Sequence, residues 1–132
     1  MPDIGKVFGK VLVAIKGELV CNGKLCSKNG TNKSNNQYLT IQIRDVSLAD
    51  VASKKIAKKV VNLPSSWSFP LKYEIEFDAS EIMTNPYNSY AISGRINLMN
   101  GSLAFVTDER NEIIDHESFT IRSTVNMHMV RI

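Results

Sequence analysis

The sequence lacks both a long hydrophobic run and the motifs that usually carry catalysis. No segment approaches the ~20 consecutive apolar residues of a membrane-spanning helix. The 132 residues include only two histidines and two cysteines, and their spacing does not match a zinc site. The motifs of serine hydrolases, zinc proteases and phosphate-binding loops are also missing from the sequence. These absences predict a protein without a membrane span, a bound metal or a cofactor, and they argue against an enzyme.

The length of the chain predicts a single domain over residues 1–132. With 43% apolar residues, the chain can bury a core without a metal or many disulfides. The net charge of +3 is unevenly spread, because residues 1–60 carry eleven Lys and Arg against four Asp and Glu, whereas residues 61–132 carry five against nine. Halves of opposite sign attract each other within one fold or between two copies, or they offer a basic face to an acidic partner.

The compartment is left open by the first residues of the chain. Residues 1–6 lack the charged region and the apolar core of a secretory signal peptide. The protein is cytoplasmic if Met1 is its native start, and secreted or exported if Met1 was added to a mature form; we favour the second. Asn29, Asn32 and Asn100 each match the acceptor pattern for N-glycosylation, although each also fits ordinary turn chemistry.

Cys21 and Cys26 flank the turn dipeptide Asn22-Gly23. If that dipeptide alone makes a two-residue hairpin turn, the cysteines lie diagonally with Cα atoms ~7–8 Å apart, which is too far for a disulfide. A four-residue turn over 22–25 places the two sulfurs opposite each other and allows the bond. The sequence permits both arrangements, so Cys21–Cys26 is a possible disulfide.

Alternation of apolar and polar residues with a period of two is the dominant pattern, and it predicts strands. Asn100-Gly101 predicts a tight hairpin between the strand before it and a further strand that begins at Ser102. The final strand is expected to be long and bent near 123–124. The strands predicted from alternation are 7–16, 37–45, 71–78, 89–99 and 119–129.

Residues 49–63 fit two structures. Their apolar residues fall at helical spacing, with Pro64 at the end, but the same segment also fits a loop followed by a strand over 55–63. One helical turn is predicted within 78–85. Seven or so strands with frequent turn signals indicate a β-sandwich or a small barrel.

The aromatic residues supply the candidate binding site. Trp67 lies in the Ser-rich segment SSWSFP. Two positions fit it: an exposed one, where it would anchor a partner or an apolar ligand, and a buried one, where it would fold back to close the end of the core. Tyr87 and Tyr90 carry the same ambiguity. The predicted binding residues are therefore Trp67, Phe69, Tyr87 and Tyr90.

Two other groups of residues favour other functions less strongly. A hydrolase site near His116 would need Asp108 or Asp115 within hydrogen-bond reach of the imidazole. The lysines of 54–59 have no aromatic residue among them for base stacking, so nucleic-acid binding is not expected. On an edge strand, such lysines also prevent edge-to-edge aggregation.

Four segments of the sequence, taken in their order along the chain, are characteristic of a known family. They read LTIQIRDVSLAD from Leu39, FPLKYEIEFDASEI from Phe69, YAISGRI from Tyr90 and GSLAFVTD from Gly101. In this order they resemble the YbaY-like and YscW-like proteins, a family of bacterial lipoproteins and type III secretion pilotins. The resemblance covers roughly residues 37–129, and strand 7–16 is similar to the opening strand of the family.

This resemblance implies an immunoglobulin-like antiparallel β-sandwich of about seven to eight strands without enzymatic activity. It favours the strand over 55–63, and it implies a protein partner, because family members of the pilotin type bind and help localise an outer-membrane secretin. Within DVSLAD, Asp45 and Ser47 are expected to accept backbone N–H groups in tight turns.

The sequence thus predicts a non-catalytic binding or assembly module whose partner is another protein or a second copy of the chain. The alternatives are a secreted structural or carrier protein that holds a small apolar ligand between its sheets, and an uncharacterised hydrolase with a site near His116.

Overall fold

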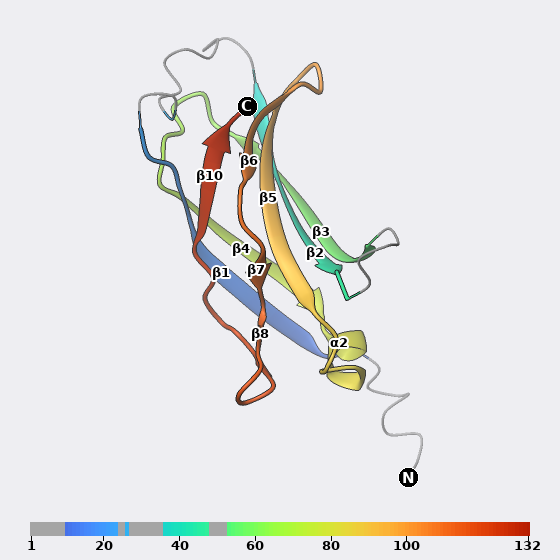
Figure 1. Ribbon diagram of the computed structural model, residues 1–132. Coiled ribbons are helices and arrows are strands. Elements are labelled where there is room, and N and C mark those ends of the chain that lie inside the picture. The colour runs from blue at the N-terminus through green and yellow to red at the C-terminus, as the bar shows by residue number, and fades with distance from the viewer. Residues whose placement is uncertain (1–9, 24–25, 27–35, 48–52) are drawn as a thin grey trace.

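A computed structural model describes residues 10–23, 26, 36–47 and 53–132. These residues form β-strands and one short helix, and the strands curl around a common core (Figure 1). The elements are β1 (Leu12–Val20), β2 (Gln37–Asp45), β3 (Lys54–Leu63), β4 (Leu71–Asp78), α2 (Ser80–Thr84), β5 (Tyr90–Leu98), β6 (Leu103–Thr107), β7 (Asn111–Glu112), β8 (Ile114–Asp115), β9 (Thr120–Ile121) and β10 (Met127–Arg131).

The main sheet has the order β3-β2-β5-β6-β10-β1-β4, and β7 pairs with β5 beside this path. Its two end strands, β3 and β4, approach each other, so the sheet forms a nearly closed barrel. Strands β8 and β9 form a separate two-stranded sheet. The expected all-β fold is confirmed, and of the two forms that the strand pattern left open, the barrel describes the sheet better than an immunoglobulin-like sandwich.

The expectation of a purely antiparallel fold is wrong at one pair of strands. In β1 and β10, Leu19 lies opposite Met127 and the two strands run parallel. A parallel bridge between Lys16 and Thr124 extends this contact along β1. The β8–β9 hairpin reverses the direction of the chain. The chain then runs beside β1 in the same direction as β1, which makes the pair parallel.

Period-two alternation located most strands well, since their apolar residues form a regular face toward the core. In β4, Tyr73, Ile75 and Phe77 are buried while the charged residues between them are exposed. Residues 54–63 form the strand β3, which confirms the strand interpretation and excludes the helix there. The predicted helical turn is α2, and the predicted hairpin at Asn100-Gly101 joins β5 to β6.

Both terminal strands differ from their predicted bounds. The first strand covers Leu12–Val20 rather than 7–16, and residues 1–9 lie outside the described residues. The final strand is interrupted between β9 and β10, where Thr124 forms an isolated bridge to Lys16 of β1. At that break the Val125 N–H donates to the Lys16 carbonyl at 2.9 Å, and the Val125 carbonyl accepts a hydrogen bond from the Tyr73 hydroxyl at 2.5 Å.

Cys21 and Cys26 form a disulfide, and their Cα atoms lie 5.5 Å apart. Four residues separate the cysteines, as the longer of the two predicted turns requires, and the Cys26 N–H donates to the Gly23 carbonyl at 3.1 Å. Gly23 has a φ of 95°, which is the left-handed conformation that glycine adopts most easily.

Candidate interaction surfaces

Trp67 lies in the core rather than on the surface. Its side chain is 5% exposed, and its indole N–H donates to the Gln37 side-chain oxygen at 3.1 Å. The ring packs edge-on against Phe69 and Phe105, with centroids 5.1 and 5.9 Å away. The Arg131 guanidinium lies over the Phe105 ring, 5.4 Å from its centre. The residue therefore closes one end of the core, and the exposed-anchor interpretation of Trp67 is wrong.

Tyr90 and Tyr87 have opposite environments. Tyr90 is fully buried, and its hydroxyl donates to the Asn85 carbonyl at 3.0 Å. Burial raises the pKa of Tyr90, as does the nearby charge of Asp45. Tyr87 is 79% exposed and packs on Phe119, with ring centroids 4.8 Å apart. Tyr87 is thus the most exposed of the predicted binding residues.

The structure does not bring the predicted binding residues together. Trp67 and Phe69 belong to the connection between β3 and β4 at one end of the barrel, whereas Tyr87 follows α2 at the opposite end (Figure 1). The Tyr87–Phe119 pair forms a small exposed aromatic surface, with the His116 ring 6.2 Å from that of Phe119. Phe119 holds a φ of 56°, a left-handed conformation that costs a bulky residue free energy.

The turn after β2 has a structural role. Asp45 accepts the Ser47 hydroxyl and N–H, at 2.5 and 3.0 Å, and the Ser47 hydroxyl oxygen accepts the Ser89 N–H at 2.8 Å. Burial raises the pKa of Asp45, but the hydrogen bonds from Ser47 and Asn88 outweigh it and hold that pKa below its ordinary value. The turn thus joins the end of β2 to the residues before β5; Leu48 to Asp50 lie outside the described residues.

The histidines do not form the hydrolase site that was considered. The imidazole of His116 lies 3.8 Å from a carboxylate oxygen of Glu112. Asp108 pairs instead with His128, at 3.1 Å, and Asp115 accepts the Glu117 N–H at 3.0 Å. Within the described part of the chain, no three His, Cys, Asp or Glu side chains gather in a way that could hold a metal ion.

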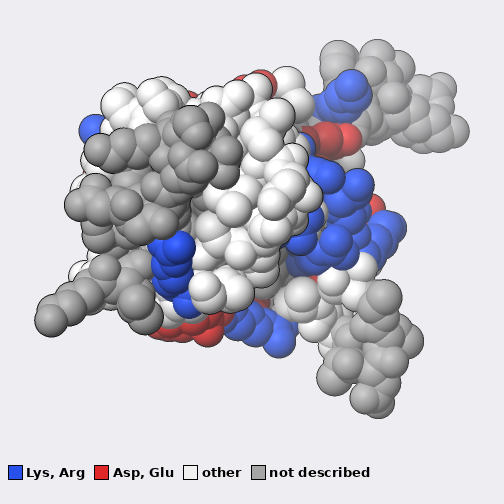
Figure 2. All heavy atoms as spheres, turned by 90° about the horizontal axis from the view of Figure 1, so that it is seen from above, with Lys and Arg blue, Asp and Glu red and all other residues white. Residues whose placement is uncertain are grey.

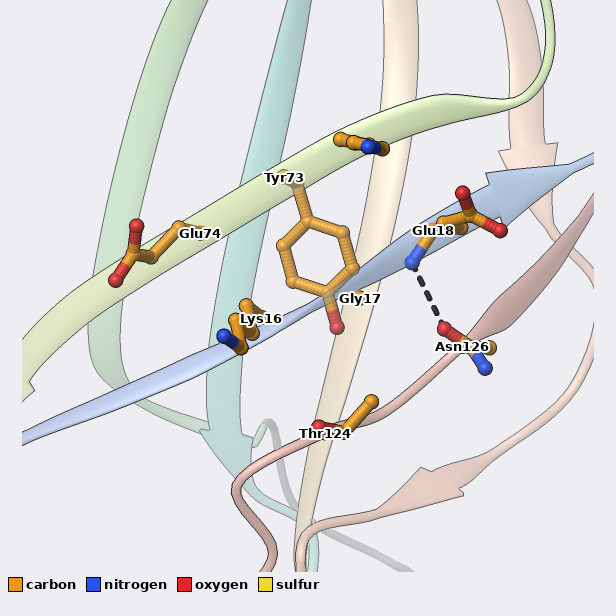
Figure 3. A pocket seen from close by; sticks show the side chains of 8 residues that line it. Lys16, Gly17, Glu18, Tyr73, Glu74, Thr124 and Asn126 are labelled. Atoms are coloured by element: carbon orange, nitrogen blue, oxygen red, sulfur yellow. Dashed lines mark hydrogen bonds between the residues drawn. The ribbon is translucent and has the colours of Figure 1, made fainter.

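A hollow of about 550 Å³ lies over β1 and β4 (Figure 3). Figure 3 shows the Tyr73 ring beside Gly17, with Lys16 and Glu74 on one side and Glu18 on the other. Lys16 is the cross-strand neighbour of Glu74, and Glu18 that of Lys72, so charges of both signs line the hollow. A second hollow of about 210 Å³, over β2, β5 and β6, is also polar. Both open to solvent, and neither is the enclosed apolar cavity that a carrier would need.

The β3 strand presents the strongest concentration of charge. Lys54, Lys55, Lys58 and Lys59 are all exposed on it. Figure 2 shows a basic patch at the side of the molecule where β2 and β3 lie, to the right in both views. Two of these lysines reach toward the β4 side of the barrel. The Lys54 ammonium lies 2.7 Å from the Glu81 carboxylate, and that of Lys59 donates to the Glu74 carbonyl at 2.7 Å.

The sequence did not indicate this contact between β3 and the β4 side. Lys59 and Glu74 are separated by the β3–β4 connection, and nothing local to either residue shows that the sheet curls far enough to bring them together. Only the lysine cluster itself was visible beforehand.

These features describe an all-β binding protein: a nearly closed barrel with an exposed aromatic pair and a basic end strand. The family model for the type III secretion system lipoprotein chaperone (YscW) matches residues 18–127, and the chain belongs to this family. The resemblance identified from the sequence is therefore confirmed.

A solved structure shows the same fold. The alternative pilotin from the type II secretion system of Vibrio cholerae superposes with a TM-score of 0.68 and 24% sequence identity, covering 91% of this chain and 98% of that chain. A search of curated proteins finds no match. Among the described residues, no helix is long and apolar enough to span a membrane.

Proposed function

We propose that this protein is a non-catalytic chaperone that binds a protein component of a bacterial secretion system and assists its assembly in the cell envelope. The observation that carries the proposal is membership of the secretion lipoprotein chaperone family over residues 18–127. The barrel that this chain shares with a type II secretion pilotin supports it at the level of the fold.

Two further observations support this role. The Cys21–Cys26 disulfide is typical of proteins that fold in an oxidising compartment, such as the bacterial periplasm. The Tyr87–Phe119 pair is an exposed aromatic surface of the kind that anchors protein partners. We therefore retain Tyr87 as a binding residue and place Trp67 and Tyr90 in the core.

The partner we propose is the outer-membrane secretin of the same organism, which is the client that pilotins of this family bind. The test is titration of the purified full chain with the purified secretin subunit, followed by calorimetry. Saturable binding supports the proposal, whereas the absence of binding at all accessible concentrations contradicts it.

A variant pair locates the surface. Tyr87→Ala is expected to weaken secretin binding by about tenfold, because an exposed aromatic anchor typically contributes about 1–2 kcal/mol. Met99→Ala is the matched control, since Met99 is 63% exposed and lies in the β5–β6 turn. Equal binding by both variants would remove Tyr87 from the interface and leave the chaperone role intact.

A further inference from the structure

The barrel has a seam between β3 and β4. In the part of the chain that the structure describes, the main sheet ends at these two strands, and no backbone ladder joins them. Side chains bridge the gap instead: Lys59 donates to the Glu74 carbonyl, and Lys54 pairs with Glu81 just beyond β4. Two lysine side chains thus span the seam from β3.

Lys59 projects from an unusual face for a charged residue. It lies opposite Ile41 in the β2–β3 ladder, and Ile41 is a core residue with 1% exposure. Residues directly opposite each other in a ladder project from the same face of the sheet. Lys59 therefore starts on the core-facing side of β3 and turns across the seam. An inward-pointing charge on an end strand is a known protection against unwanted strand pairing.

Among the strands that the structure describes, none pairs with the facing edge of β4. The hydrogen bond from Lys59 of β3 shows that the Glu74 carbonyl points into the seam. In an antiparallel pair, residues alternate between those that exchange backbone hydrogen bonds with the partner strand and those that face away. The backbone groups of Lys72 and Glu76 therefore face the seam as well, while Tyr73 and Ile75 pair with β1. Such an edge is a template for an added strand.

Charge decides which strand can be added. A second copy of β3 would bring exposed lysines against exposed lysines, which disfavours pairing between two copies of this chain. An incoming strand also displaces Lys59 from the Glu74 carbonyl, and the freed ammonium then needs an acceptor. A carboxylate on the incoming strand supplies that acceptor. Residues of the incoming strand that point toward the core would meet Val61 and Ile75, which favours apolar side chains at those positions of the strand.

We propose that the β3–β4 seam receives an extended segment of the protein partner, which adds to the β4 edge as a strand and pairs a carboxylate side chain with Lys59. This inference rests on the proposed function, because it names the part of the partner that binds. The Lys59 ammonium occupies the place on the Glu74 carbonyl that an N–H of the added strand takes.

The first test blocks the β4 edge. Glu74→Pro removes the N–H that faces the seam and leaves the β1–β4 ladder intact, because proline is tolerated on a free strand edge. The probes are the purified secretin subunit and overlapping synthetic peptides that tile its sequence. Glu74→Pro is expected to weaken binding by about tenfold or more. The matched control, Glu74→Ala, keeps the N–H and should change the affinity by less than about twofold. Circular dichroism confirms that both variants fold.

The second test isolates the charge pair by a double-mutant cycle. Lys59→Gln, and a Glu→Gln or Asp→Asn change in the tightest-binding peptide, should each weaken binding by about fivefold. The two changes together should weaken it little further, since each removes the same pair. Additive losses would place the carboxylate elsewhere and overturn the proposed pairing with Lys59.

The outcomes separate the two proposals. If wild-type protein binds the secretin but Glu74→Pro binds it and every peptide equally well, the seam proposal is overturned and the chaperone function stands. If wild-type protein binds neither the secretin nor any of its peptides, both proposals fall.

Discussion

Among the glycines that the structure describes, Gly17 leaves the least room for an added methyl group. A Cβ atom there would overlap the carbonyl group of Val125, whose N–H is fixed by a 2.9 Å hydrogen bond to the Lys16 carbonyl. We expect Gly17→Ala to lower the free energy of unfolding by about 1–3 kcal/mol, measured by urea denaturation. Gly94→Ala is the matched control, because its Cβ would meet side-chain methyl groups rather than backbone, those of Ile41 at 3.2 Å, Leu19 at 3.5 Å and Thr107 at 3.8 Å. Equal losses in the two variants would contradict this explanation.

Trp67 is the only tryptophan in the sequence, so its fluorescence reports one environment. Because the side chain is 5% exposed, we expect weak quenching by iodide in the native state and strong quenching in urea. Trp67→Phe should also cost about 1–3 kcal/mol of stability, since the buried Gln37 oxygen loses the indole donor. Strong native-state quenching would show that the β3–β4 connection does not close the core.

The sequence around Trp67 could not have settled its position. The segment SSWSFP has the same local character whether the ring is exposed or buried. The ring is buried because Gln37 and Phe105, from β2 and β6, lie beside it. Burial of a lone aromatic thus depends on residues distant in sequence, whereas the turn of Asp45 and Ser47 is local and was anticipated.

At the scale of elements, strands with a regular apolar face were predictable and their partners were not. The alternation in β2 and β4 gave their bounds directly, because each buries a regular apolar face. The break between β9 and β10 falls where a bend near 123–124 was expected, but the parallel pairing of β10 with β1 was missed. Alternation shows which face of a strand is buried, but it carries no information about which strand lies beside it.

Asp78 joins three elements, which makes their packing sensitive to acid. Its carboxylate ends β4 and accepts the backbone N–H groups of Val11, before β1, and of Ser80, in α2, at 3.1 and 3.0 Å. These hydrogen bonds, with that of Val11 first, hold the pKa of Asp78 below its ordinary value of 3.8. A carboxyl whose pKa is lowered on folding stabilises the protein above its unfolded-state pKa, and this contribution is lost as the pH falls through the folded-state value.

The substitution Asp78→Asn tests this linkage. We expect it to lower stability at pH 7 and to reduce the further loss between pH 5 and pH 2, because the amide no longer titrates in that range. Urea denaturation at a series of pH values measures both effects. Asp45→Asn provides a comparison in which the carboxyl bonds Ser47 instead of joining β1 to α2. A variant with the acid sensitivity of the wild type would show that Asp78 does not couple to folding.

At the scale of the whole molecule, the uneven charge of the sequence is partly reconciled within the fold. Lys54 from the basic half meets Glu81 from the acidic half, as one of the sequence-based interpretations allowed. The seam itself was beyond prediction, because it exists only once the sheet curls. The family resemblance gave the class of protein, but neither the closure of the barrel nor the position of Lys59 followed from the motifs.

The nearly closed barrel leaves β3 as an end strand, and its lysines should keep it from pairing with other copies. We expect the double variant Lys55→Thr and Lys58→Thr to sediment as larger species than the wild type at equal concentration. Lys16→Thr with Arg122→Thr is the matched control, because it removes the same charge away from the β3 edge. In 1 M NaCl, where the Debye length is about 3 Å, the wild type should shift toward the β3 variant. Equal sedimentation of the two double variants would instead assign any self-association to net charge alone.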